Sequence, residues 1–377
     1  MDMSVSMRNP DFFTDNSRLQ DIMFFDDVDI DSYASLIKES TYKPVSISDI
    51  VNTQTHLWSE ECHALSNILN KHTTLFDGTL KVYPHRLVHL DVIPNAIPRH
   101  LRAYPVAHIH LEVFKAKLLC LCNIGVLEIC GASQWASPTF IIPKKDGTVC
   151  WVSDFRGLNK VIQRHIYPLP RIQDILNRLS GYSFFSKLDV SMQYFTFELD
   201  ADSQKLCVIS TPFGLYKYKR LPMGVKQSSD IAQEVMENLF RDLDNVEVYI
   251  DDIGCFSSSF TNHICTLDII LTRLEQNGFT VNPSKCEWAV QETDWLGYWL
   301  TPTGLKPWPK KIKAITAMQA PVNIKQVRSF IGAVTYYHDM WPRRSHILAP
   351  LTDLTGKGTF NWTPVHQKAF EIGRAHV

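Results

Sequence analysis

Long apolar runs are missing from this 377-residue chain. A transmembrane helix needs about 20 consecutive apolar residues, whereas the most apolar window, residues 116–132, is interrupted by Asn123 and Glu128. The N-terminus, MDMSVSMRNPDFF, lacks the basic start and the apolar core of a secretory signal. The sequence therefore predicts an intracellular protein without a membrane partner.

Paired cysteine spacing is also missing, although the chain contains nine cysteines. In a chain of this length, unpaired spacing predicts reduced thiols rather than a disulfide framework. Zinc would be one use for the neighbouring Cys120, Cys122, Cys130, His108 and His110. Their positions on or beside an amphipathic pattern favour ordinary helix residues, because the paired spacing of zinc ligands is absent.

Basic residues are scarce in one segment of the chain, and acidic residues are scarce in another. Residues 1–50 contain ten acidic and only four basic residues, which predicts a linker or a loosely ordered arm. Residues 301–350 contain eight Lys or Arg and a single acid, Asp339. This basic segment is either a contact surface for nucleic-acid phosphates or a solvated helix face, and charge alone does not decide between them.

Hydrophobic spacing predicts alternating helices and strands without an internal repeat. We expect helices at 58–75, 108–128, 167–181, 227–243, 261–278 and over most of 307–354, and hairpins at 138–155 and 210–222.

The elements between residues 183 and 282 follow the order β-α-β-β-α-β, which is the ferredoxin-like arrangement. One strand ends at Asp189, two strands form a hairpin around Asp251 and Asp252, and the last strand is expected at 279–282. In this arrangement the Asp189 strand lies beside the hairpin in one antiparallel sheet. Helices cover only one face of that sheet, so the other face is free for a ligand.

Two adjacent aspartates interrupt the strand pattern VEVYIDDIGCFS at residues 246–257. Strands are depleted in Asp, and two carboxylates about 4 Å apart repel each other by roughly 4 kcal/mol at an effective dielectric of about 20. Hard cations such as Mg²⁺ prefer carboxylate and phosphate oxygens and remove this repulsion. Asp189, Asp251 and Asp252 would together hold two Mg²⁺ ions, which can activate a hydroxyl and hold a leaving pyrophosphate. An ordinary turn is the alternative for a bare Asp-Asp pair.

A series of sequence blocks resembles the reverse transcriptase of gypsy-type long-terminal-repeat retrotransposon Pol polyproteins. The resemblance covers residues from about 60 to about 370, and its blocks are WASPTFIIPKKDGT, VSDFRGLNK, YPLPRIQDIL, SKLDVSMQYF, LPMG, YIDD, NPSKCEW, WLGYWLTPTGLKP and RSFIGAVTYYHDMWP. It implies an α+β right-hand fold of fingers, palm and thumb with a ferredoxin-like palm. It also implies RNA- and DNA-directed DNA synthesis with two Mg²⁺ ions, Mn²⁺ being the alternative ion.

The same resemblance implies partners and a domain order. The partners are an RNA or DNA template with its primer, deoxynucleoside triphosphates, and protease, ribonuclease H and integrase domains of a full polyprotein, in a cytoplasmic virus-like particle. The expected parts are an acidic arm at 1–55, an N-terminal lead with the fingers at 56–185, the palm at 186–300 with a fingers insertion near 205–222, the thumb at 301–350, and a truncated connection or ribonuclease H start at 351–370.

The final residues 371–377, EIGRAHV, have an unusual possible origin. They can be encoded by GAGATCGGAAGAGCACACGTC, which resembles a ligated sequencing adapter. We therefore expect them to be an artefact.

Positions that match the family motifs carry over the family's roles. Asp189, Asp251 and Asp252 are the expected metal ligands and catalytic acids, and Lys285 resembles the lysine that protonates the leaving pyrophosphate. Tyr194 resembles an aromatic gate whose ring clashes with a ribose 2′-hydroxyl, a core aromatic being the alternative. The expected nucleotide-binding positions are Lys144, Lys145, Cys150, Tyr194 and Met223, and the primer and template positions are Arg156, Ile250, Leu296, Gly297 and Tyr298.

Three positions depart from the family pattern. Cys150 stands where relatives carry an arginine for the triphosphate, Gly157 stands where Glu is usual, and Ser229 replaces an expected Pro. Together with the missing ribonuclease H acids, they support a second hypothesis, a catalytically impaired nucleic-acid-binding remnant of a decaying element. A third hypothesis is another two-metal enzyme such as a nuclease, which the ordered blocks disfavour.

Overall fold

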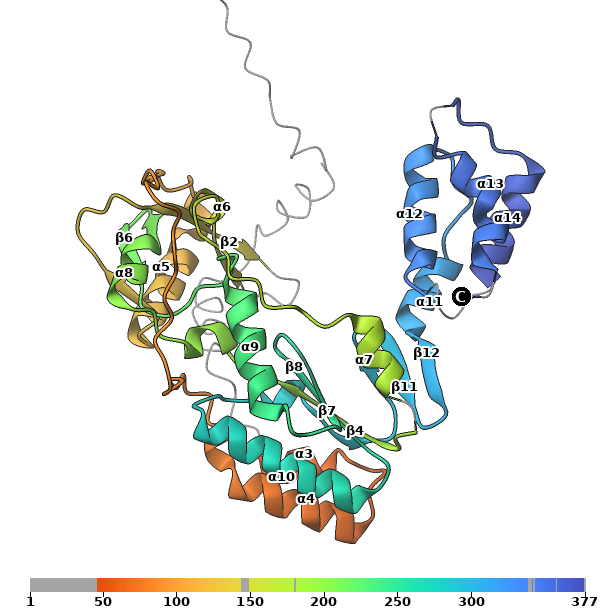
Figure 1. Cartoon of the computed structure of the whole chain (residues 1–377), viewed down its shortest axis with the longest axis horizontal. Helices are drawn as coiled ribbons and strands as arrows, with labels where there is room; N and C mark the ends of the chain where they lie inside the picture. Colours follow the sequence, from red (N-terminus) through yellow and green to blue (C-terminus); the bar gives the residue numbers. More distant parts are fainter. Residues whose placement is uncertain are drawn as a thin grey trace, which may run out of the picture.

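The computed structural model describes residues 46–143, 149–179, 181–337, 341, 343–356 and 358–375. Their elements form a U, with a five-stranded sheet in one arm, a four-stranded sheet at the base and a group of helices in the other arm (Figure 1). Within these ranges, every helix is too short or too polar to cross a lipid bilayer.

The four-stranded sheet has the predicted ferredoxin-like topology. Its strand order is β7-β8-β4-β9, every neighbouring pair is antiparallel, and helices α9 and α10 provide the two connections. The bounds are β4 Phe184–Asp189, α9 Ser228–Phe240, β7 Val246–Tyr249, β8 Asp252–Ser257, α10 Phe260–Gln276 and β9 Glu287–Val290.

The predicted last strand was placed too early in the chain. Residues 279–282 form only an isolated bridge, in which Val281 pairs with Val190, one residue beyond the end of β4. The short 3₁₀ helix η4, Pro283–Lys285, then turns the chain back, and β9 pairs with β4 instead. The apolar residues Phe279 and Val281 are fully buried, so the strand-like pattern at 279–282 reflects burial rather than sheet pairing.

The two faces of this sheet differ in what covers them. Leu188 of β4 and Ile253 of β8 are fully buried in the cluster that includes α9 and α10 residues. Side chains alternate between faces along a strand, so Asp189 and Asp252 project from the opposite face. We call this second face the open face.

The helix side of the sheet is extended by N-terminal elements. Helix α4, Ser59–Lys71, packs against α10, and α3, Ile47–Asn52, packs against α4. Ile50 and Val51 of α3 are buried, so packed structure begins within the arm predicted for residues 1–55. The helix predicted at 58–75 is confirmed as α4 followed by the 3₁₀ helix η2, Thr73–Phe76.

The five-stranded sheet has the order β1-β6-β5-β2-β3 and contains both predicted hairpins. Trp151 of β3 packs on Phe114 of helix α5 with a ring-centroid distance of 4.8 Å, which joins the sheet to the helix predicted at 108–128. The bounds are α5 His108–Asn123, β1 Leu127–Ile129, β2 Ser137–Pro143, β3 Val149–Ser153, α6 Arg156–Asn159, α8 Ala201–Leu206, β5 Val208–Thr211 and β6 Gly214–Tyr218.

A three-stranded sheet covers the apolar end of the open face. Its order is β10-β11-β12, with bounds Thr293–Trp295, Tyr298–Thr301 and Gly304–Pro307. Phe185 of β4 and Phe256 of β8 pack here with Trp295 and with helix α7, Ile172–Arg178. The apolar end of the open face is therefore covered, while its acidic end is not part of this cluster.

The second arm is a helical unit with its own core. Helices α11, α12, α13 and α14 span Pro309–Thr316, Ile324–Thr335, Arg344–Asp353 and Pro364–Ala375, and Phe330, Leu348 and Phe370 share one buried cluster. The predicted boundary at 350 cuts α13, just as the boundaries at 185 and 300 cut β4 and β11. Helix α14 thus packs with the preceding helices α11 and α13.

Candidate active site

Asp189 and Asp252 are direct partners across β4 and β8. Opposite residues of an antiparallel pair have Cβ atoms about 4.5–5.5 Å apart. Asp251 lies in the turn before β8, where its carbonyl oxygen accepts a 3.2 Å hydrogen bond from the Val190 N–H. The structure therefore brings the three predicted acids together at the uncovered end of the open face.

The electrostatics of this group favour added positive charge. Burial raises the pKa of Asp252 to about 6, and the Asp251 carboxylate adds to the rise. Burial also raises the pKa of Asp189, while the Lys285 ammonium opposes that rise. Lys285 lies on η4 with Nζ 3.3 Å from Asp189 Oδ2 and 3.4 Å from Oδ1. The Lys285 and Lys187 ammonium groups both act on Asp189, and the Lys187 charge only partly offsets the rise at Asp252.

Mg²⁺ fits this arrangement of oxygen donors. In the described ranges, no three His, Cys, Asp or Glu side chains form a ready-made metal cage. Mg²⁺ does not need such a cage, because it usually takes one or two protein carboxylates and completes its shell with water and substrate phosphates. A cation at Asp189 would compete with the Lys285 ammonium, and one at Asp252 would offset the desolvation and the Asp251 repulsion that raise its pKa.

Tyr194 lies between helix α9 and the acidic turn. It belongs to the 3₁₀ helix η3, Gln193–Thr196, which contacts α9. Burial raises the pKa of Tyr194, a hydrogen bond with Ser229 opposes the rise, and the Asp251 charge adds to it. Ser229, one of the departing positions, therefore contacts the predicted gate.

Two further predicted nucleotide-binding residues, Cys150 and Met223, belong to the five-stranded sheet and to the loop that follows it. Cys150 pairs with Ile142 across the hairpin, and the alternation of β3 puts it on the face opposite Trp151. Lys144 and Lys145 lie outside the described residues. Met223 is half exposed in the loop between β6 and α9.

Arg156 opens helix α6 and forms an ion pair with Asp154 at 2.7 Å. Hydrogen bonding by Arg156 lowers the pKa of Asp154 to about 2. Asn159 of the same helix donates a 2.8 Å hydrogen bond to the carbonyl oxygen of Gly224 and accepts one of 2.9 Å from the Lys226 N–H. Sequence reasoning missed Asn159, which lies in the block VSDFRGLNK and joins the Arg156 helix to the loop of Met223.

The three predicted grip residues form a tight turn that contacts the helical arm. Leu296 and Gly297, at φ +46° and +82°, form the two-residue loop between β10 and β11. Their carbonyl oxygens accept hydrogen bonds from the hydroxyls of Tyr336 at 2.7 Å and Tyr337 at 3.0 Å. The tyrosine pair lies in the block RSFIGAVTYYHDMWP, whose sequence does not indicate this contact.

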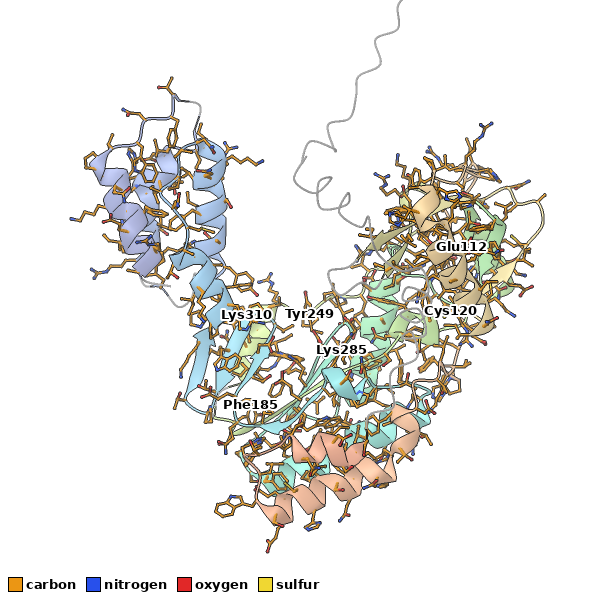
Figure 2. All side chains as sticks on the ribbon, turned by 180° about the vertical axis from the view of Figure 1, so that it is seen from behind. Glu112, Cys120, Phe185, Tyr249, Lys285 and Lys310 are labelled. Atoms are coloured by element: carbon orange, nitrogen blue, oxygen red, sulfur yellow. The ribbon has the colours of Figure 1, made fainter. Side chains whose placement is uncertain are left out.

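The grip and the acids meet through one apolar cluster. Tyr249, the first residue of YIDD, borders the same buried cluster as Leu296. Tyr298 belongs to that cluster too, and its hydroxyl donates to the Tyr336 carbonyl oxygen at 3.0 Å. Figure 2 shows Tyr249 and Lys285 at the base of the U and Lys310 on the helical arm.

Comparisons with known proteins agree with this geometry. Residues 142–300 match the family model described as reverse transcriptase (RNA-dependent DNA polymerase). The chain contains a domain of the reverse transcriptase family. It is 31% identical over 313 residues to the retrovirus-related Pol polyprotein from transposon 297 of Drosophila melanogaster, which covers 81% of this chain and 30% of that protein. It is 29% identical over 274 residues to the transposon Tf2-3 polyprotein of Schizosaccharomyces pombe, which covers 72% of this chain and 20% of that protein.

Solved reverse transcriptases have the same fold. The foamy viral protease-reverse transcriptase in complex with double-stranded DNA has a TM-score of 0.80 at 22% identity, covering 88% of this chain and 60% of that one. The foamy viral complex with an RNA/DNA hybrid has a TM-score of 0.76 at 22% identity, covering 88% and 46%. The predicted right-hand polymerase fold is therefore confirmed. The chain spans only 30% and 20% of the length of the two transposon polyproteins.

Proposed function

We propose that this chain is an RNA- and DNA-directed DNA polymerase that extends a primer with deoxynucleotides. The observation that carries the proposal is the pairing of Asp189 with Asp252, beside Asp251, on the uncovered end of the open face. Three carboxylates concentrated there suit the binding of metal-nucleotide complexes. The names of the sequence relatives and of the structural neighbours support the same reaction.

Two divalent ions, which we propose are Mg²⁺, would activate the primer hydroxyl and stabilise the leaving pyrophosphate. Asp189, Asp251 and Asp252 would hold them. Lys285 has an exposed ammonium beside Asp189, from which it can donate a proton to the pyrophosphate. Tyr194, next to the acidic turn, would contact the nucleotide sugar and exclude a 2′-hydroxyl.

The arms of the U would hold the substrates. We assign the five-stranded sheet to the fingers, the four-stranded sheet to the palm and helices α11–α14 to the thumb. Cys150, Arg156 and Met223, with Lys144 and Lys145, would face the nucleotide and the template. Ile250 and the turn of Leu296, Gly297 and Tyr298 would contact the primer end. We further propose that the domain works within a polyprotein with protease, ribonuclease H and integrase domains, in a cytoplasmic virus-like particle.

A primer-extension assay tests this function. The full chain would be given a labelled DNA primer on an RNA or a DNA template with deoxynucleotides, in Mg²⁺ or in a chelator. Extension that requires the metal is the expected result. Binding without extension would support the second candidate, an impaired remnant, which Cys150 favours because it lacks the charge of the usual arginine. Degradation of the strands would indicate a nuclease.

A further inference from the structure

Ile250 adopts a backbone conformation that β-branched residues rarely tolerate. It is the first of the two residues between β7 and β8, and its φ is +58°. Left-handed backbone is disfavoured for residues with a Cβ, and most so for β-branched ones. A two-residue hairpin loop with positive φ at its first position prefers glycine there. The turn that presents Asp251 and Asp252 is therefore strained, and something outside it must hold it.

Two buried glutamines hold both polar groups of the Ile250 backbone. The Ile250 N–H donates to Gln233 Oε1 at 2.7 Å, and the Ile250 carbonyl oxygen accepts from Gln193 Nε2 at 3.0 Å. Gln233 Nε2 also donates to the Val248 carbonyl oxygen at 3.0 Å, which ties the glutamine to strand β7. Gln233 and Gln193 are 0% and 2% exposed, so water does not compete strongly for these bonds.

The two glutamines come from separate elements around the site. Gln233 lies within helix α9, and Gln193 begins η3, directly after the left-handed Met192 and directly before Tyr194. Helix α9, the acidic turn and the segment of the predicted gate Tyr194 are thus connected through the backbone of Ile250. A displacement of Ile250 would move Asp251 and Asp252 relative to Asp189, whose position is set by β4.

We propose that Gln233 and Gln193 are positioning residues that brace the strained turn and so set the geometry of the three acids. The functional part of this inference rests on the proposed polymerase activity. The structural part, that the glutamines hold Ile250 in its left-handed form, stands without it.

A double-mutant cycle tests the brace. Gln233→Met keeps the shape of the side chain but removes its hydrogen bonds to Ile250, Val248 and Glu237, and Ile250→Gly removes the strain that the Ile250 bond opposes. In the wild-type background, Gln233→Met should lower kcat for nucleotide addition about 10- to 100-fold, as expected for hydrogen bonds to buried groups. Template–primer affinity should stay within about 3-fold, because phosphate contacts dominate it. In the Ile250→Gly background the same change should cost less than about 3-fold, because glycine adopts this turn unaided.

A matched glutamine and an activity-independent measurement complete the test. Gln204→Met is the control, since Gln204 lies in helix α8, away from the turn, and donates to the Leu199 carbonyl oxygen just before that helix. Hydrogen exchange of the peptide spanning 246–252 should become about 10-fold faster in Gln233→Met and unchanged in Gln204→Met. This result is expected even if the wild type extends no primer, so it separates the brace from the proposed function.

Two results would overturn the brace. One is an equal loss of kcat in both backgrounds, and the other is unchanged exchange in folded Gln233→Met. If Gln233→Met does not fold, Gln193→Met removes a single hydrogen bond and must then show the same faster exchange.

Discussion

The Tyr336 hydroxyl donates a 2.7 Å hydrogen bond to the carbonyl oxygen of Leu296. This bond joins helix-arm residues to the grip turn between β10 and β11. The Lys311 ammonium lies 3.4 Å from the centroid of the Tyr336 ring, a cation–π contact, and burial lowers the pKa of Lys311. Tyr336, which donates one of the polar contacts between the turn and the helical arm, is therefore also held by Lys311 through its ring.

Tyr336→Phe should weaken template–primer binding about 3- to 10-fold, because it removes one hydrogen bond between the predicted grip turn and the helical arm proposed as the thumb. The KM for deoxynucleotides should not change, since the acids and the predicted gate are untouched. Fluorescence anisotropy with a labelled duplex measures the binding. Tyr182→Phe is the control, because Tyr182 borders the same apolar cluster. Equal affinities of Tyr336→Phe and wild type would show that this bond does not position the primer.

Asp251→Asn should reduce primer extension to below a few per cent of wild type while leaving template–primer affinity nearly intact. The carboxylate would bind metal, whereas affinity for nucleic acid comes mainly from phosphate contacts. Asp244→Asn is the matched control, since Asp244 is an exposed acid just before β7. Substantial residual extension by Asp251→Asn would argue against Asp251 as a metal ligand.

Asp252 should make the metal requirement depend on pH. Its folded pKa of about 6 lies above the usual 3.8, so the folded state holds this proton more tightly than the unfolded state. The cost of its charge is therefore fully present above pH 6 and disappears as the pH falls towards 4. The Mg²⁺ concentration for half-maximal extension should rise steeply between pH 7 and pH 5, because protonated Asp252 is a poor ligand.

The same shift predicts a stability change that needs no activity. Without Mg²⁺ at pH 7.5, Asp252→Asn should raise the free energy of unfolding by about 1–2 kcal/mol, a value reduced for partial solvent screening. The gain should vanish near pH 4. Denaturant unfolding at the two pH values measures it, and a gain that is equal at both would show that Asp252 has an ordinary pKa in the folded state.

Tyr194→Ala should admit ribonucleotides by removing the ring that would clash with a 2′-hydroxyl. The ratio of kcat/KM for deoxynucleotides over ribonucleotides, measured on one primer–template, should fall by at least about 10-fold, the equivalent of about 1.4 kcal/mol. Ser229→Ala is an informative companion, because it removes only the hydroxyl bonded to Tyr194. An unchanged ratio in Tyr194→Ala would show that Tyr194 is a core aromatic.

The acidic centre could be predicted from sequence because short-range rules determine it. Asp189 ends an apolar strand and Asp252 begins another, and side-chain alternation then assigns both to one face once the strands pair. The predicted strand at 279–282 was wrong because two apolar residues at alternate positions, Phe279 and Val281, cannot by themselves distinguish burial from strand pairing. The chain turns at the 3₁₀ helix that begins at Pro283, and β9 forms the last strand of the sheet instead.

The supports of the site could not be predicted in the same way. The contacts of Gln233 with Ile250, and of Tyr336 with Leu296, join residues on different elements, and no local pattern specifies such pairs. Glutamine within an amphipathic helix usually indicates a solvated face, yet Gln233 is fully buried. Only the tertiary structure shows that its amide satisfies a strained turn.

The last prediction concerns Cys150, whose thiol supplies no charge and only a weak hydrogen-bond donor. If residue 150 faces the nucleotide, an arginine there would add charge-assisted bidentate bonds to the triphosphate. Bonds of this kind are worth roughly 1.5–3 kcal/mol, or about 10- to 100-fold in rate. Cys150→Arg should therefore raise kcat/KM for deoxynucleotides by that factor and leave template binding nearly unchanged.

Val152→Arg provides the matched control for Cys150→Arg. Val152 lies two residues along β3, so alternation puts it on the same face but farther from the hairpin tip. A general gain in positive charge would improve both variants through template binding, whereas a specific triphosphate contact would improve only Cys150→Arg. Equal nucleotide efficiency of wild type and Cys150→Arg would mean that residue 150 does not face the triphosphate, or that Lys144 and Lys145 already supply the charge. The hypothesis of an impaired polymerase copy would then lose its main support.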